Sequence, residues 1–169
     1  MSLNQETSTD PVALATRSAL GLLLLTSVHH AYGAYVYNTP WRYRVLPVSG
    51  ITALTIWRAA AVMRSHSSPR TARIARGLFV VATLGFTVIL IGGVEGAYNH
   101  LVKNLLYFGG APDAVIQRLF PPPTYEMPND AFFEITGISQ AFVGGLTAWH
   151  LWKARRLLVI GHKRQLSGE

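Results

Sequence analysis

Four apolar runs, each about as long as a bilayer is thick, limit the folds that are open to this chain. They extend over residues 18–37, 45–63, 74–99 and 131–152. A helix needs about 20 residues to cross the hydrocarbon core of a membrane, and strands of soluble proteins are much shorter. Within lipid the backbone must satisfy its own hydrogen bonds, which favours helices. The sequence therefore predicts an all-α fold: an integral membrane bundle of four transmembrane helices.

Composition excludes several classes of protein. The chain has no cysteine among its 169 residues, so it has no disulfide, no thiolate metal site and no cysteine nucleophile. Its net charge of +7 would suit nucleic acid, but the basic residues gather at the ends of the apolar runs. Membrane proteins contact lipid head groups at these positions. We therefore expect membrane lipids, and no nucleic acid, as partners.

The distribution of Lys and Arg predicts the orientation in the membrane. Four crossings place both termini and the middle loop on one side, which holds ten basic residues: Arg17, Arg64, Arg70, Arg73, Arg76, Lys153, Arg155, Arg156, Lys163 and Arg164. The other side holds Arg42, Arg44, Lys103 and Arg118. Because cytoplasmic loops are the richer in basic residues, we expect both termini in the cytoplasm of a bacterial inner membrane or its equivalent. Residues 1–17 and 161–169 are then cytoplasmic tails of a membrane domain formed by residues 18–160.

The connection between the third and fourth runs, about residues 101–130, is long for so small a protein. Pro112 suits the first turn of a helix, and Pro121 ends it. Between them lies an apolar stripe made of Val115, Ile116, Leu119 and Phe120. We expect a short amphipathic helix here, which either covers the outer mouth of the bundle or anchors the loop in the interface.

Six ionisable side chains lie in or beside the outer halves of the predicted helices: His29, His30, Glu95, His100, Asp130 and Glu134. Ionisable groups at membrane depth are costly, and they usually face the bundle interior for a functional reason. With a rise of about 1.5 Å per residue, the two glutamates lie about 5 Å below the outer helix ends and the adjacent histidines about 10–12 Å below. We therefore predict one shared site in the outer half.

Small residues along the same helices support an inward orientation of the two glutamates. In membranes, rows of small residues mark the faces where helices approach closely. Such a row is expected to share a face with Glu134, and it consists of Gly137, Ala141, Gly145 and Ala148. Glu95 is expected to share its face with Gly92, Tyr98 and Asn99, and Gly96 follows Gly92 at a spacing of four.

One hypothesis is acid–base catalysis on an apolar or lipidic substrate. A carboxylate would accept the proton, a histidine would be its partner, and Asn99 or Tyr98 would orient it. Two carboxylates and a histidine in an apolar pocket provide the separated pKa values that such chemistry requires. The candidate catalytic residues are Glu95, Glu134, His29, His30, Asn99 and Tyr98.

The other hypothesis is a bound divalent transition metal, since imidazole and carboxylate without thiolate suit Zn, Fe, Mn or Cu(II). The candidate ligands are His29, His30, Glu95, His100, Asp130 and Glu134. A single ion is expected, because the paired Glu-x-x-His motifs of di-iron bundles are absent. Asp130 also suits the N-cap of the fourth helix, which is a purely structural role.

Both hypotheses make the chain a small membrane enzyme with a lipophilic substrate. The alternative is a non-catalytic membrane subunit or assembly factor, whose buried polar residues hold helices together or bind a partner. That protein would work as a homo-oligomer or within a larger membrane complex. Both alternatives stay open at the level of the sequence.

Overall fold

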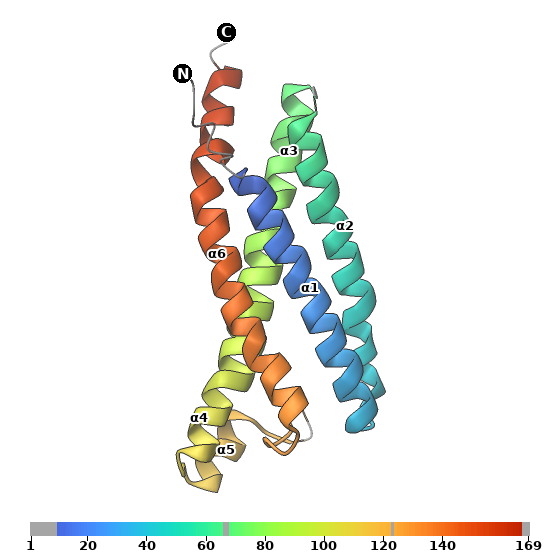
Figure 1. The fold of residues 1–169 in the computed structure, drawn as a ribbon, viewed down its shortest axis with the longest axis vertical. Helices are drawn as coiled ribbons and strands as arrows, with labels where there is room; N and C mark the ends of the chain where they lie inside the picture. Colours follow the sequence, from blue (N-terminus) through green and yellow to red (C-terminus); the bar gives the residue numbers. More distant parts are fainter. Residues whose placement is uncertain (1–9, 66–67, 123, 167–169) are drawn as a thin grey trace, which may run out of the picture.

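Long helical rods make up the protein in the computed structural model, which describes residues 10–65, 68–122 and 124–166 (Figure 1). No strand occurs within these ranges, so the all-α prediction is confirmed. In chain order the elements are α1 (Pro11–Val36), η1 (Pro40–Arg44), α2 (Val45–Arg64), α3 (Pro69–Val80), η2 (Val81–Val102), α4 (Lys103–Phe108), α5 (Asp113–Leu119) and α6 (Ala131–Leu166).

Three rods are long and apolar enough to cross a membrane: Pro11–Val36, Pro40–Arg64 and Pro69–Phe108. The third is one continuous helix composed of α3, η2 and α4. The fourth rod, α6, has 36 residues but is less apolar on average, and it is not among these candidate spans. Length and composition thus support a multi-pass membrane protein.

The first helix begins earlier than its apolar run predicts. α1 starts at Pro11 rather than near Ser18, because Asp10 caps it: the carboxylate accepts a hydrogen bond of 2.9 Å from the backbone N–H of Val12. Proline is favoured in a first turn, where its missing N–H costs nothing. Residues 1–9 and 167–169 of the two predicted tails lie outside the described residues.

The third rod ends later than predicted. It continues through α4 to Phe108, so the connection to α6 starts at Gly109 and not near residue 101. This correction places Lys103 and Asn104 on a helix, where both are buried.

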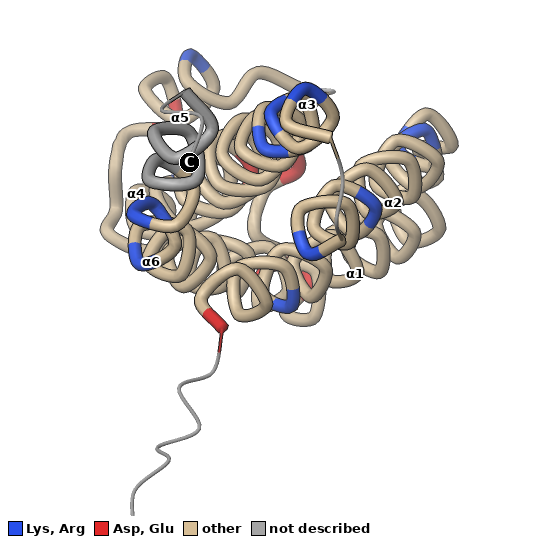
Figure 2. The backbone as a smooth tube through the Cα atoms, turned by 90° about the horizontal axis from the view of Figure 1, so that it is seen from above, with Lys and Arg blue, Asp and Glu red and all other residues tan. Residues whose placement is uncertain are grey.

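The bundle has two distinct ends (Figure 1). Both ends of the described chain and the α2–α3 connection lie at one end, which we call the terminal end, and η1, α4 and α5 lie at the opposite, loop end. Seen from the terminal end, Lys and Arg positions lie on α1, α2, α3 and α6 near this end of the bundle (Figure 2). The apolar core fills the terminal half and includes Leu22, Ile56, Phe79 and Leu151.

Glycines bring η2 and α6 into backbone contact. A Cβ atom at Gly92 would lie 2.8 Å from the Cα of Gly144, and one at Gly96 would overlap the backbone of Ala141. The predicted small-residue contact face next to Glu95 is therefore confirmed.

On α6 the predicted face is wrong in one position. Gly145 is exposed and a Cβ there would meet no atom within 4 Å, whereas Gly144 is buried against η2. The buried stripe consists of Glu134, Gly137, Gln140, Gly144, Thr147, Leu151 and Ala154. A helix has 3.6 residues per turn, so residues at repeated four-residue spacings rotate gradually around it. The expected row therefore does not stay on the face that contacts η2.

Replacing Gly96 by Ala should destabilise the bundle, because a backbone contact cannot yield as a side chain can. We expect the free energy of unfolding to fall by about 1–3 kcal/mol, as for other overpacked interiors. Thermal unfolding in detergent measures this. Gly85→Ala is the matched control, because Gly85 is an exposed residue of the same helix with open space around it. Equal midpoints for the two variants would contradict the close packing of η2 and α6.

Residues at the loop end of α1 hold the start of α6. Tyr32 donates a hydrogen bond of 2.9 Å to Asp130 Oδ2, and Tyr37 donates one of 2.7 Å to Asn129 Oδ1. Burial, reinforced by nearby carboxylates, raises the pKa of Tyr37 to about 12, so its hydroxyl stays a donor at neutral pH. Asp130 Oδ1 accepts from the backbone N–H of Phe133 at 2.8 Å, so Asp130 is the N-cap of α6.

Candidate metal centre

Three histidine rings and one carboxylate oxygen converge between α1 and η2. The Nε2 atoms of His29, His30 and His100 lie 3.5, 3.7 and 3.6 Å from Oε1 of Glu95. One ligand atom from each of His29, Glu95 and His100 lies within 4.8 Å of the others. We call these four residues the His–Glu cluster. The structure thus brings together four of the six predicted ionisable residues.

The winding of η2 puts two members of the cluster on one face. Residues five apart in a regular α-helix point about 140° away from each other. η2 is instead wound as a π-helix, in which hydrogen bonds join residues five apart. Glu95 and His100 therefore face the same way. Reasoning from α-helical periodicity grouped Glu95 with Tyr98 and gave no sign of its contact with His100.

A hydrogen bond to Thr136 orients the His29 ring. Its Nδ1 lies 3.0 Å from Oγ1 of Thr136. That hydroxyl donates its single hydrogen to backbone carbonyls one turn back in α6, at 2.8 and 3.0 Å. When it donates to one of these carbonyls, it accepts a hydrogen bond from Nδ1–H of His29. In the neutral ring Nε2 then presents a lone pair toward Glu95.

The other two rings are oriented in the same way. Nδ1 of His30 lies 3.0 Å from the carbonyl oxygen of Thr26, which can only accept. Nδ1 of His100 lies 2.8 Å from Oε2 of Glu134. That carboxylate also accepts from Lys103, so it is ionised and accepts from His100 as well. In their neutral forms, both rings thus carry the hydrogen on Nδ1 and a lone pair on Nε2.

In this tautomer each of the three rings places its unprotonated Nε2 3.5–3.7 Å from Glu95 Oε1. Nε2 of His29 is buried and has no hydrogen-bond partner among the described residues. Acceptors at this distance repel unless a cation lies between them, either a metal ion or a shared proton. Ligand atoms of His29, Glu95 and His100 are close enough to share one metal ion.

Glu134 supports the cluster from behind His100 instead of joining it. Its Oε1 accepts from Nζ of Lys103 at 3.0 Å, and its Oε2 accepts from Nδ2 of Asn104 at 2.5 Å. Lys103 also donates to the carbonyl of Glu126 at 2.6 Å. Sequence reasoning missed Lys103 and Asn104, because it placed both in the outer loop. The signal that could have found them is their spacing of three and four residues from His100 on a continuing helix.

Three of the predicted site residues, Asn99, Tyr98 and Asp130, lie in different environments. Nδ2 of Asn99 donates to Oε2 of Glu95 at 2.8 Å, which orients the carboxylate as expected. Tyr98 instead donates to the carbonyl of Leu119 at 3.3 Å and is exposed, so it does not contact the cluster. Asp130 caps the start of α6, and it is not among the residues whose ligand atoms are close enough to share a metal ion.

Close packing leaves the rings little freedom. Phe133 stacks on His29 with ring centroids 4.1 Å apart and an interplanar angle of 19°. A Cβ at Gly137 would overlap the His100 ring, and one at Gly33 would overlap Phe133. The two glycines are thus needed for the rings to reach their positions, and the packing holds the donor atoms in place.

A small cavity opens beside the cluster toward the loop end. Its volume is about 130 Å³, and its lining includes His30, Glu95, Asn99, His100, Arg42 and Tyr125. A substrate or water molecule in this cavity would touch the cluster directly.

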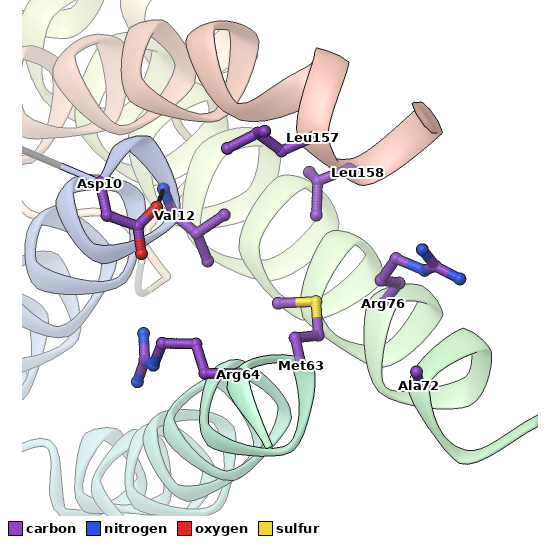
Figure 3. Close-up of a pocket in the computed structure, with 8 residues that line it drawn as sticks. All are labelled: Asp10, Val12, Met63, Arg64, Ala72, Arg76, Leu157 and Leu158. Carbon is purple, nitrogen blue, oxygen red and sulfur yellow. Dashed lines mark hydrogen bonds between the residues drawn. The ribbon is translucent and has the colours of Figure 1, made fainter. Parts of the chain in front are cut away.

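A larger cavity at the terminal end lacks such chemistry. It measures about 340 Å³ and is lined by Asp10, Val12, Met63, Arg64, Ala72, Arg76, Leu157 and Leu158. Figure 3 shows the apolar side chains pointing into it from α1, α2 and α6. None of the histidines of the cluster reaches it, and Asp10 is occupied as the cap of α1.

No protein-family model matches the sequence, and no curated protein or solved structure is significantly similar to it. The function is therefore inferred from the geometry of the site.

Proposed function

We propose that this protein is a membrane-embedded, metal-dependent enzyme. A single divalent transition metal would be bound by Nε2 of His29, Nε2 of His100 and Oε1 of Glu95, and its fourth position would be open toward the cavity, which His30 lines. One observation carries the proposal: ligand atoms of His29, Glu95 and His100 lie within 4.8 Å of one another, and the other nitrogen of both rings has a hydrogen-bond partner.

The distances fit an ion of ordinary size. In a tetrahedral site with bonds of about 2.0–2.1 Å, neighbouring ligand atoms are about 3.4 Å apart. The three Nε2 atoms lie 3.5, 3.7 and 3.6 Å from Oε1 of Glu95. Nitrogen and oxygen donors without sulfur suit zinc, iron, manganese or copper(II).

The hydrogen bonds behind the ligands also favour a metal over a shared proton. Histidines that bind metals nearly always donate their other N–H to a carboxylate, a carbonyl or water, which fixes the ring and raises its basicity. Glu134 provides this for His100 and the Thr26 carbonyl for His30, and Thr136 accepts from His29. Proton sharing without a metal, as in acid–base catalysis, is the competing explanation.

The cavity gives the ion an open side, as in catalytic metal centres. A metal there would polarise an oxygen of the substrate or activate a water molecule. Asn99 would hold the Glu95 carboxylate in place, and Glu134 would keep the hydrogen of His100 on Nδ1.

We also propose that α6 is a fourth crossing and that both termini are cytoplasmic. α6 packs against α1 and η2, which supports a common depth in the bilayer. The Lys and Arg residues near the terminal end support its placement on the cytoplasmic side (Figure 2). The His–Glu cluster would then lie in the outer half of the membrane.

Metal analysis of the protein purified in detergent tests the proposal. We expect about one zinc, iron, manganese or copper ion per chain, lost to a chelator and replaced by Co²⁺ with a visible absorption band. His100→Ala should lose this binding. His150→Ala should keep it, because His150 lies on α6 and bonds to Ser18, away from the cluster. A protein that contains no metal and binds none on addition would favour metal-free acid–base chemistry instead.

A further inference from the structure

The wall of the cavity beside the His–Glu cluster includes a cationic side chain that is not part of the cluster. Arg42 of η1 lines this cavity and is 4% exposed. Its guanidinium stands over the rings of Trp41 and Phe133, 5.1 Å from each centroid. The wall of the cavity thus places a buried positive charge beside the proposed metal.

The donors of Arg42 are poorly satisfied. The only carboxylate near its guanidinium within the described segments is Glu126, at a long 3.9 Å. Its Nε is buried and has no hydrogen-bond partner in those segments. A guanidinium has five N–H donors in a planar fork, and leaving them unused in a buried site is costly.

The charge around the cavity changes sign when a metal binds. Glu95, Glu126, Arg42 and Lys103 line the cavity, and Glu134 lies behind its wall, paired with Lys103 and His100, so three carboxylates stand against two cationic side chains. With neutral histidines the site then carries one net negative charge, and a divalent ion converts this to one net positive charge. A bound ion is the largest local charge in such a site, and a weakly solvated site with excess positive charge favours an anion.

We propose, on the basis of the proposed metal centre, that the cavity binds a carboxylate group between the metal and the Arg42 guanidinium. The planar fork of arginine matches a carboxylate through two parallel hydrogen bonds. The cavity of about 130 Å³ is well below the roughly 300 Å³ of ordinary ligand pockets, so it admits only a small group. The carboxylate belongs either to a small soluble acid or to a fatty acid whose chain leaves through the opening.

The test uses Co²⁺-loaded protein in neutral detergent, titrated separately with acetate and with dodecanoate. We expect a saturable change in the visible Co²⁺ absorption with at least one of them. If dodecanoate binds more tightly than acetate, the bound carboxylate belongs to a lipidic acid. If dodecanoate binds equally or more weakly, the carboxylate belongs to a small soluble acid. Both results support the proposal.

Three variants make the test specific. Arg42→Lys should weaken anion binding at least about tenfold while keeping Co²⁺, because it retains the charge but loses the fork. Glu126→Gln should strengthen it, because it removes the carboxylate that competes for Arg42. Arg44→Lys, an exposed position on the same η1 segment, should leave it unchanged.

The outcomes separate the two proposals. If Co²⁺ binds but its spectrum changes with neither acetate nor dodecanoate, the carboxylate site alone is overturned. The same holds if the wild type, Arg42→Lys and Glu126→Gln bind the acids with equal affinity. Absence of Co²⁺ binding in the wild type overturns the metal centre and the carboxylate site with it.

Discussion

Replacing Glu95 by Gln should lower the affinity of the His–Glu cluster for a divalent transition metal by more than about 100-fold. Loss of a group that merely orients a ligand typically costs about 10–100-fold, and here the anionic ligand shared by all three rings is removed. The amide has nearly the shape of the carboxylate, so the packing around it is kept. Competition with a chromophoric chelator, in detergent, measures the affinity.

Glu126→Gln is the control for this experiment. Glu126 lines the same cavity and carries the same charge, but it pairs with Arg42 and contacts no histidine of the cluster. We expect it to keep most of the metal affinity. An equal loss in both variants would show that net charge, and not ligation by Glu95, holds the ion. Undiminished affinity in Glu95→Gln would remove the metal centre as described.

Gly137→Ala should also disrupt the site strongly, although it alters no ligand. The added methyl group would overlap the His100 ring, which hydrogen bonds hold against Glu134 at 2.8 Å. The ring must move, so we expect the metal affinity to fall by about 10–100-fold, as when a ligand loses its orientation. The free energy of unfolding should fall by about 1–3 kcal/mol from overpacking. Metal titration and thermal unfolding measure the two effects.

Gly145→Ala is the matched control on the same helix, because no atom lies within 4 Å of its added methyl group. Both substitutions replace Gly by Ala and gain the same helix propensity, so the difference in stability between the two variants measures the effect of the clash alone. In a His100→Ala background the destabilisation by Gly137→Ala should disappear, since the ring is then absent. If the two losses of stability instead add, the methyl group clashes with something other than His100.

The helices were predictable because their signal is local. Three of the apolar runs fall on the rods that are long enough for a membrane, to within one residue, and the second matches α2 almost residue for residue. Proposing a site from His29, His30, Glu95 and His100 needed only the cost of ionisable groups at membrane depth. Asn99 as the partner of Glu95 followed from helical spacing, because residues four apart share a face.

Other parts of the site depend on features that no local pattern carries. The π-type winding of η2 turns His100 toward Glu95, and the continuation of the rod through α4 brings Lys103 to Glu134. Arg42, expected on a flanking loop, is buried beside the cluster because Gly33 leaves room near Phe133. The first two depend on how one helix is wound and where it ends, and the third depends on the packing of α1 against α6.

The sequence by itself thus determined which segments are helices and which residue types can bind a metal, because hydrophobic length and side-chain chemistry are properties of single residues and short windows. Only the tertiary structure decided which nitrogen of each ring faces Glu95 and which residues stand behind the ligands. The physical reason is that these choices follow from the distance and rotation between helices. For His100 and Glu134 the glycine contacts between η2 and α6 set both, and a contact of that kind exists only once the two backbones have met.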